Sequence, residues 1–269
     1  MPYRYFLGPV IAVILIYFGY ILYNNLEPNL WFLLFMSILI VFLFIFKHQI
    51  NEWWWSKRPI ELEQRDKNWI KEHIALFKAP TIRDDDEFFL ELAKYCQIQE
   101  FIPMGDFKIE EEAKWMSLSP AIVLKIFKNP ELYKHYIRTV FYRHPFLTPD
   151  QDYVHISEFN EEDGVLIFSI EQLFNANFHP DKYLNPALYE WSKIWSRQYL
   201  TSIDLTDHNF IKENICKQLQ CQYTDILVWM GQNELDEKAL LVYNYILYPN
   251  ELQKSLPEYF QEINNILTE

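Results

Sequence analysis

Glu190 has the clearest capacity for chemistry in this chain, because its neighbours stand at a spacing that metal sites use. In the helical motif H-E-x-x-H, two histidines four positions apart hold zinc, and the glutamate between them acts as general base. Here Tyr189 and Lys193 occupy the two histidine positions around Glu190. A protonated lysine cannot ligate zinc, and a neutral tyrosine is a poor ligand. The motif therefore predicts a glutamate that has lost its metal.

Two interpretations of this helix remain open. Glu190 and Lys193 lie one helical turn apart, so they can pair directly. In a partly buried cleft the ammonium would offset the charge of Glu190 where a dication once did, whereas at a surface the pair would be worth under about 1 kcal/mol. In the plainer interpretation, the apolar and aromatic residues of the segment are core and rim positions of an amphipathic helix. These residues are Tyr189, Trp191, Ile194 and Trp195.

The elements that position Glu190 can be read from the residues before it. Residues 164–169, Gly-Val-Leu-Ile-Phe-Ser, predict a buried strand after an acidic turn at residues 161–163. A polar, Asn-rich connection follows at residues 175–185. Pro186 then opens a helix that we expect to run to about Leu200, because proline is tolerated in a first helical turn.

This order of strand, loop and helix resembles the active region of the MtfA-type zinc peptidases, the glucose-regulated metallopeptidases. Their pattern is G-x-V-x-L-S-W, a loop with Asn and His, and then V-L-H-E-F-A-H. The positions that match it are Gly164, Leu166, Ser169, Leu188 and Glu190. The resemblance implies a zincin-like fold and, for the family, a zinc cofactor.

A second block supports the resemblance downstream. Residues 233–249 are similar in length and apolar rhythm to the family segment N-P-A-E-F-F-A-V-x-S-E-x-F-F-E-x-P, whose S-E glutamate is the third zinc ligand. Pro249 through Tyr259 match its closing P-x-x-L…P-x-L-Y pattern, and anchoring on Pro249 places the ligand position at Tyr243. The resemblance covers residues 80 to 266 and implies that all three ligands are replaced, by Tyr189, Lys193 and Tyr243, so that no zinc is expected here.

The remaining pattern predicts an α+β domain of helices around a small sheet. We expect helices over residues 84–97, 109–127, 209–218, 236–247 and 250–266, and further strands over residues 135–143 and 154–157. Pro120 predicts a break or kink in the second of these helices. Residues 51–79 read as an amphipathic, charged connector that Pro80 ends, so the predicted domains are 1–50, 51–79 and 80–269.

Two apolar segments predict a transmembrane hairpin in the lipid bilayer. Residues 5–23 and 30–46 carry no charge, and about 17 to 25 apolar residues span a bilayer as helix, the second segment being near the lower limit. Neither has the small-residue cleavage site of a signal peptide. Arg4 precedes the first segment and Lys47 follows the second, while the connecting loop holds only Glu27. Positive flanks predict a plasma (inner) membrane protein with two spans and both termini in the cytoplasm.

Composition excludes several function classes. The net charge of −13 disfavours binding to nucleic acid, and an aromatic content of 18% argues against long disordered stretches. The acidic runs at residues 84–87, 110–112 and 161–163 lack the alternation and central glycine of a calcium loop. Three cysteines without C-x-x-C fit reduced cytosolic thiols.

The first functional hypothesis is a membrane-anchored pseudopeptidase that binds a protein partner, since a fold persists when its site chemistry is lost. The alternative is an active zinc-dependent peptidase with ligands recruited elsewhere. A third possibility is an enzyme built on Asp204, Asp207 and His208, although Asp-x-x-Asp-His is more often a loop and helix cap, and no nucleophile motif accompanies it.

Overall fold

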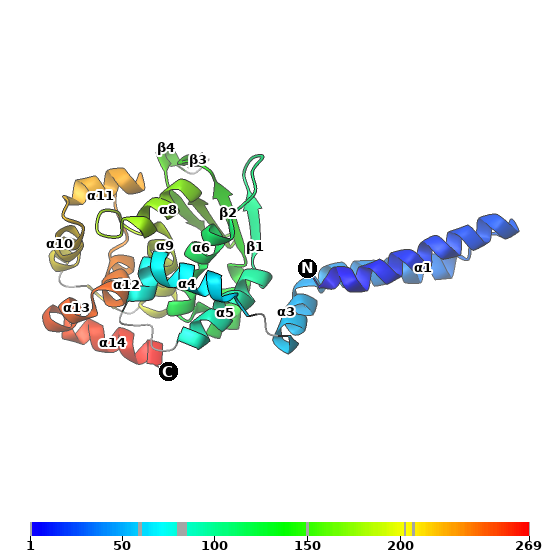
Figure 1. The fold of residues 1–269 in the computed structure, drawn as a ribbon, viewed down its shortest axis with the longest axis horizontal. Coiled ribbons are helices and arrows are strands. Elements are labelled where there is room, and N and C mark those ends of the chain that lie inside the picture. Colours follow the sequence, from blue (N-terminus) through cyan, green and yellow to red (C-terminus); the bar gives the residue numbers. More distant parts are fainter. Residues whose placement is uncertain are drawn as a thin grey trace. The chain divides into compact units, whose positions relative to one another are not determined.

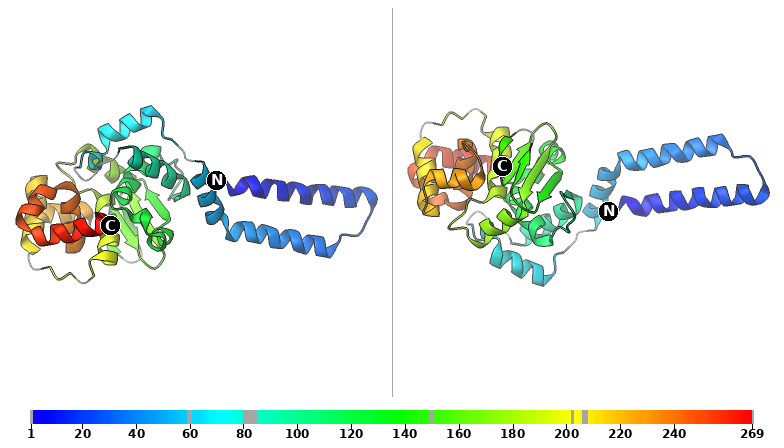
Figure 2. Two further views of the ribbon diagram at one scale, coloured as in Figure 1. Left: turned by 90° about the horizontal axis from the view of Figure 1, so that it is seen from below. Right: turned by 90° about the horizontal axis from the view of Figure 1, so that it is seen from above.

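The computed structural model describes residues 2–58, 61–79, 85–148, 151–201, 203–205 and 208–268, in two compact units, Met1–Ile60 and Glu61–Glu269. The first unit contains α1 (Tyr3–Asn24), α2 (Leu30–Ile45) and α3 (Lys47–Lys57). Figure 2 shows α1 and α2 running side by side in opposite directions. At the turn the Tyr17 hydroxyl accepts a hydrogen bond of 2.7 Å from the backbone N–H of Asn29. The predicted hairpin is therefore helical in both arms.

The two arms differ in length, and only one of them qualifies by itself as a membrane span, whereas the sequence predicts two, the second near the lower limit. α1, with 22 residues, is long and apolar enough to cross a bilayer. α2 has only 16 residues, which at 1.5 Å per residue is about 24 Å, short of the roughly 30 Å hydrocarbon core. It reaches span length only if it is counted together with α3 across a bend of 71°. Among the described residues, α1 is therefore the helix that qualifies by itself as a membrane span, by length and composition alone.

The second unit is a mixed α/β domain (Figure 1). Its helical elements are α4 (Gln64–His73), η1 (Ala75–Lys78), α5 (Asp85–Ile98), α6 (Glu111–Val123), η2 (Ile126–Lys128), α7 (Pro130–His135), α8 (Ile170–Phe178), α9 (Pro186–Tyr199), α10 (His208–Leu219), α11 (Tyr223–Met230), α12 (Glu237–Leu247), α13 (Pro249–Ser255) and α14 (Pro257–Thr268). Its strands are β1 (Glu100–Pro103), β2 (Arg138–Tyr142), β3 (Phe146–Thr148), β4 (Gln151–His155), β5 (Ser157–Asn160) and β6 (Val165–Ser169). The predicted fold class, helices with a small sheet, is confirmed at this level.

The main sheet has the strand order β1-β2-β6-β5. β1, β2 and β6 run parallel, whereas β5 lies at the edge and pairs antiparallel with β6. β3 and β4 form a separate two-stranded ribbon. The turn into β6 requires glycine, because Gly164 has φ +61° and a Cβ there would lie 2.0 Å from the carbonyl oxygen of His135.

α9 is the central helix of this domain. It packs on β5 and β6 and also contacts α6, α8 and α12. Its start is set by Asn185, whose side chain accepts from the backbone N–H of Leu188, and by Pro186 in the first turn. Trp191 and Trp195 are each only 1% exposed. The predicted helix from Pro186 to about Leu200 is thus present, but almost all of its surface is buried.

Some predicted boundaries differ from the observed ones. The expected connector 51–79 is divided, because residues 51–57 lie in α3 while Ile70, Ile74 and Leu76 are buried in the core of the second unit. The expected polar loop begins inside α8, and the last predicted helix is broken at Pro257 into α13 and α14. Pro120 lies inside α6 without ending it. Pro80 and Asp84 lie outside the described residues.

Candidate functional site

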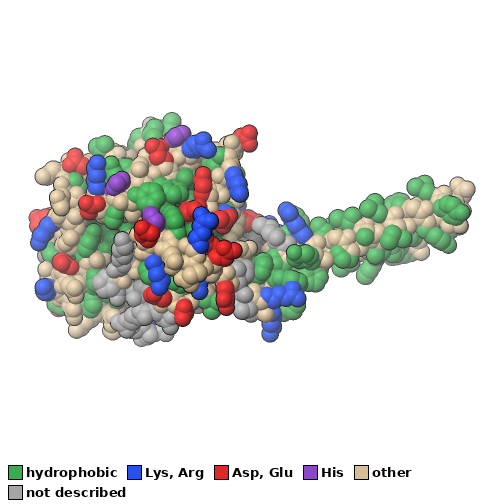
Figure 3. Space-filling model, in the orientation of Figure 1, with side chains coloured by type: hydrophobic (Ala, Val, Ile, Leu, Met, Phe, Trp, Pro, Cys, Tyr) green, Lys and Arg blue, Asp and Glu red, His purple; other side chains and the backbone are tan. Residues whose placement is uncertain are grey.

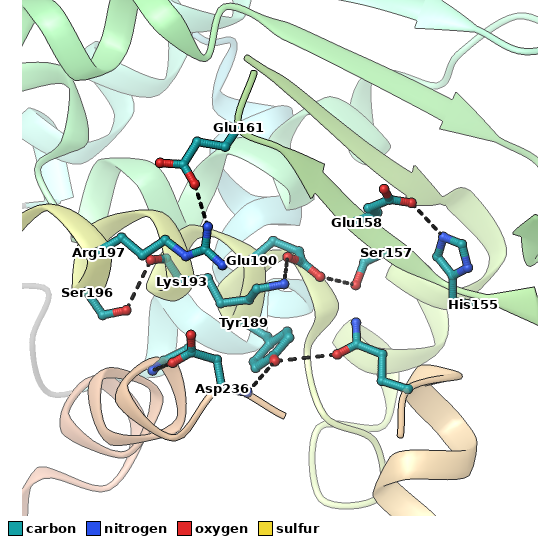
Figure 4. A network of polar contacts seen from close by, with 12 residues as sticks. His155, Ser157, Glu158, Glu161, Tyr189, Glu190, Lys193, Ser196, Arg197 and Asp236 are labelled. Carbon is teal, nitrogen blue, oxygen red and sulfur yellow. Dashed lines mark hydrogen bonds and ion pairs between the residues drawn. The ribbon is translucent and has the colours of Figure 1, made fainter. Parts of the chain in front are cut away.

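The polar side chains around Glu190 form a buried group that we call the α9–β5 cluster. It consists of Glu190 and Lys193 on α9, Ser157 and Glu158 on β5, and His155 at the end of β4, and Figure 4 shows these side chains together. Glu190, Ser157 and His155 are each 0% exposed. Charged and polar groups are rarely buried without partners, so the contacts within the cluster decide what it can do.

Both oxygens of the Glu190 carboxylate are engaged. The Ser157 hydroxyl donates to Oε1 at 2.8 Å, and the Lys193 ammonium lies 3.0 Å from Oε2. The ammonium approaches Oε2 as a close charge contact and not as a well-directed hydrogen bond, so that oxygen is compensated by charge. Lys193 is itself largely covered, and its Nζ lies 4.8 Å from the ring centroid of Phe159. The pair is therefore internal, and the surface interpretation of it is excluded.

A second ion pair lies beside the first. The imidazole Nε2 of His155 is 2.9 Å from a carboxylate oxygen of Glu158, and its Nδ1 is 3.0 Å from the carbonyl oxygen of Tyr153. Because both ring nitrogens face acceptors, both must carry a proton to satisfy them. The Thr148 hydroxyl also donates to the same oxygen of Glu158 at 2.7 Å.

The electrostatics agree with a charged His155–Glu158 pair. Burial would lower the pKa of His155, but the hydrogen bonds to Glu158 and Tyr153 and the negative charge of Glu158 outweigh it and raise that pKa. Burial would raise the pKa of Glu158, but the hydrogen bonds from His155 and Thr148 lower it on balance. The negative charge of Glu190 also raises the pKa of His155, and the positive charge of Lys193 lowers the pKa of Glu158. Two cations and two anions thus form one nearly neutral unit.

Tyr189 is fixed by contacts on the other side of α9. Its hydroxyl accepts a hydrogen bond of 2.8 Å from the backbone N–H of Asp236 and donates to Gln232 at 3.4 Å. Its ring lies 5.2 Å from the Nζ of Lys193. Burial, followed by the negative charge of Glu190, raises the pKa of Tyr189 well above its usual range. The side chain is a neutral phenol that joins α9 to the start of α12.

Tyr243 contacts α9 at a different place from Tyr189. It projects from α12, is 1% exposed, and its hydroxyl accepts a hydrogen bond of 3.1 Å from the backbone N–H of Asn185, the residue that caps α9. Burial raises its pKa far above the usual value. The structure thus brings Tyr189, Lys193 and Glu190 together, while Tyr243 binds the start of the helix, about one turn before Tyr189.

These residues do not fit a zinc ion. Tyr189 and Tyr243 are neutral phenols whose oxygens accept backbone hydrogen bonds, and Lys193 is an ammonium paired with a carboxylate. Zinc takes thiolate, imidazole or carboxylate ligands. Within the residues that the structure describes, no three His, Cys, Asp or Glu side chains are grouped so as to hold a metal ion.

A pocket of about 540 Å³ lies beside Tyr189, because its lining residue Asp236 donates a backbone hydrogen bond to the Tyr189 hydroxyl. Residues 203–205 and 234–238 line it, and four of them are acidic, namely Asp204, Glu234, Asp236 and Glu237. Asp236 caps α12 with its side chain, and its backbone N–H binds Tyr189. Of the predicted set Asp204, Asp207 and His208, the first lies in this pocket, the second is outside the described residues, and the third begins α10.

Sequence reasoning did not find His155, Ser157 or Glu158. A histidine and a glutamate three positions apart on short strands are a weak signal, because such pairs occur in many chains. The stronger signal was that three of the four residues 155–158 are polar at the short strand expected over residues 154–157. Comparison of the sequence with protein-family models and with curated proteins finds no match.

Proposed function

We propose that this protein is a membrane-anchored pseudopeptidase, derived from an MtfA-type ancestor, that acts by binding another protein. The observation that carries the proposal is the Lys193 ammonium, 3.0 Å from Oε2 of a completely buried Glu190. The charge that a zinc ion would supply beside the glutamate is supplied by an internal lysine. Removal of the metal ligands therefore leaves no uncompensated carboxylate in the core.

The contacts of Glu190 argue against a role as general base. A general base must reach the proton that it abstracts, directly or through one water molecule. Here the side chain is fully covered, one carboxylate oxygen accepts from Ser157, and the other faces Lys193. The alternative, an active zinc peptidase with recruited ligands, would need imidazole or carboxylate groups near Glu190. The nearby His155 uses both ring nitrogens in other contacts.

The first unit suits membrane anchoring. α1 has the length of a span, and its side chains and those of α2 are mostly outward-facing and apolar, as a lipid environment favours. Basic residues flank the hairpin, and its loop contains none. We infer an inner-membrane hairpin with cytoplasmic termini, in which the shorter α2 is accommodated by local bilayer thinning.

The acidic pocket at residues 203–205 and 234–238 is the surface where we expect the partner to bind. It is hollow, it is next to Tyr189 on the former active helix, and its negative charge favours a basic segment. The partner class that fits this proposal is a protein; nucleic acid is disfavoured by charge.

Two measurements on the full-length protein in detergent test this function. Elemental analysis should find no stoichiometric zinc, and a broad peptide library should remain uncleaved. A photoreactive amino acid at Glu234 should capture a discrete protein in cells, whereas the same residue at the exposed Lys254 on α13 should not. One zinc per chain, with peptide cleavage that is lost in Glu190→Gln, would establish the enzyme instead.

A further inference from the structure

The C-terminus of α10 holds two cysteines in a defined turn. The helix ends at Leu219, the next residue Gln220 has φ +51°, and the backbone N–H of Cys221 donates to the carbonyl of Cys216 at 3.1 Å. The left-handed residue after the helix and the hydrogen bond that closes a six-residue turn are features of the Schellman motif. Cys216 and Cys221 occupy its two ends, the positions whose side chains characteristically contact each other.

The two thiols are near each other and reachable from solvent. The 3.1 Å hydrogen bond joins the backbones of the two residues across the turn, which favours the short Cα separation, about 4.4–6.8 Å, that a disulfide requires. Cys221 is close enough to act electrostatically on Cys216. Both side chains are partly exposed, unlike the structural core residues on the other face of α10, such as Ile211 and Ile215.

We propose that Cys216 and Cys221 form a redox modification site, which closes to an intramolecular disulfide on reaction with a small-molecule disulfide. The thiolate of one cysteine attacks a sulfur of the oxidant, which breaks the oxidant's S–S bond and releases one thiolate. The second cysteine then attacks the protein sulfur of this mixed disulfide and releases the second thiolate. Two protein thiols are oxidised, the oxidant is reduced to two thiols, and these take up the two protons.

The surroundings set the rate of this reaction. Burial and then the charges of neighbouring groups, among them Asp225, raise the pKa of Cys216, and burial and Asp225 raise that of Cys221. Asp225 is held beside them because it forms the capping box of α11 with Gln222. Since the thiolate is the nucleophile, the pair should react slowly at neutral pH and about tenfold faster for each pH unit of rise below the thiol pKa.

The disulfide would fix the junction between α10 and α11. One to two turns earlier, α10 is attached to α12 by the Asn214–Asn244 hydrogen bond of 2.6 Å and the Lys212–Glu237 ion pair of 2.6 Å. Oxidation would therefore hold the C-terminal end of α10 in place as well as the part of α10 that is attached to α12. In a reducing compartment the site rests as a dithiol.

The test uses the full chain in detergent, incubated with oxidised dithiothreitol or oxidised glutathione, acid-quenched and labelled with maleimide after denaturation. Two of the three labels should be lost. Trypsin cleaves after Lys217, so Cys216 and Cys221 fall on different peptides, and residues 213–217 should appear linked to residues 218–238 until reductant is added. Cys96→Ser should behave like wild type.

The controls separate the proposal from its alternatives. After incubation with oxidised dithiothreitol, whose mixed disulfides recyclise and are released, Cys216→Ser and Cys221→Ser should each retain both remaining labels, with circular dichroism spectra like that of wild type. With oxidised glutathione each variant should instead stop at the mixed disulfide, because no second cysteine is present to displace the glutathione. Retention of all three thiols in wild type under conditions that oxidise free dithiothreitol would overturn the proposal. So would a crosslink found only between two chains, or one that includes Cys96.

Discussion

Replacing Lys193 by methionine tests whether the ammonium compensates the buried Glu190. The substitution keeps most of the side-chain volume and removes the charge 3.0 Å from Oε2, while Ser157 still donates to Oε1. Glu190 is 0% exposed, so water cannot replace the lost cation. Breaking a buried ion pair by removing one partner costs about 3–5 kcal/mol. For a domain of this size that corresponds to a fall in melting temperature of roughly 10 °C.

The assay is chemical and thermal unfolding of the full chain in detergent, followed by tryptophan fluorescence, because Trp191 and Trp195 are buried on α9. Lys254→Met is the matched control, since Lys254 is exposed on α13, and it should change the free energy of unfolding by less than about 0.5 kcal/mol. Adding Glu190→Gln to the Lys193 variant removes the unpaired charge, so it should restore much of the loss.

The reasoning is refuted if Lys193→Met is no more destabilising than Lys254→Met. It is also refuted if the double variant with Glu190→Gln is as unstable as the single one.

Three further perturbations follow from the described contacts. His155 has a raised pKa when folded, so its stabilising effect is complete below about pH 6.5 and declines as the pH rises through the raised value; Glu158, with a lowered pKa, contributes above about pH 4.5. The denaturant concentration at the unfolding midpoint of wild type should therefore fall as the pH rises on the alkaline side. The midpoint of His155→Gln should depend less steeply on pH. A variant whose midpoint changes with pH as steeply as that of wild type would contradict this. Gly231→Ala should cost about 2 kcal/mol or more in the same denaturant titration, because φ is +65° and the new Cβ would lie 2.1 Å from the Val154 carbonyl oxygen in β4, and an unchanged midpoint would contradict this. Asn25→Cys, in the hairpin loop, should react with impermeant maleimide on intact cells, and protection there would reverse the inferred topology.

The local pattern predicted the elements around Glu190 but not all of their partners. Pro186 after Asn185 predicted where α9 begins, and the apolar run before Ser169 predicted β6, because caps and periodicity are properties of adjacent residues. The Glu190–Lys193 pair followed from helical spacing in the same way. α8 and β1 were missed, since short elements carry few periodic positions and are fixed by the sheet and helices that cover them.

The sequence by itself determined which residues could pair along one helix and which segments were apolar enough to meet lipid. Only the tertiary structure decided that Glu190 is fully buried, that Ser157, 33 residues away, donates to it, and that a second ion pair, His155–Glu158, lies beside it. It also placed the Tyr243 hydroxyl against the backbone of Asn185, at the start of α9. The physical reason is that spacing along a chain fixes neighbours only within an element, whereas burial and contacts between elements depend on how helices and strands pack through space.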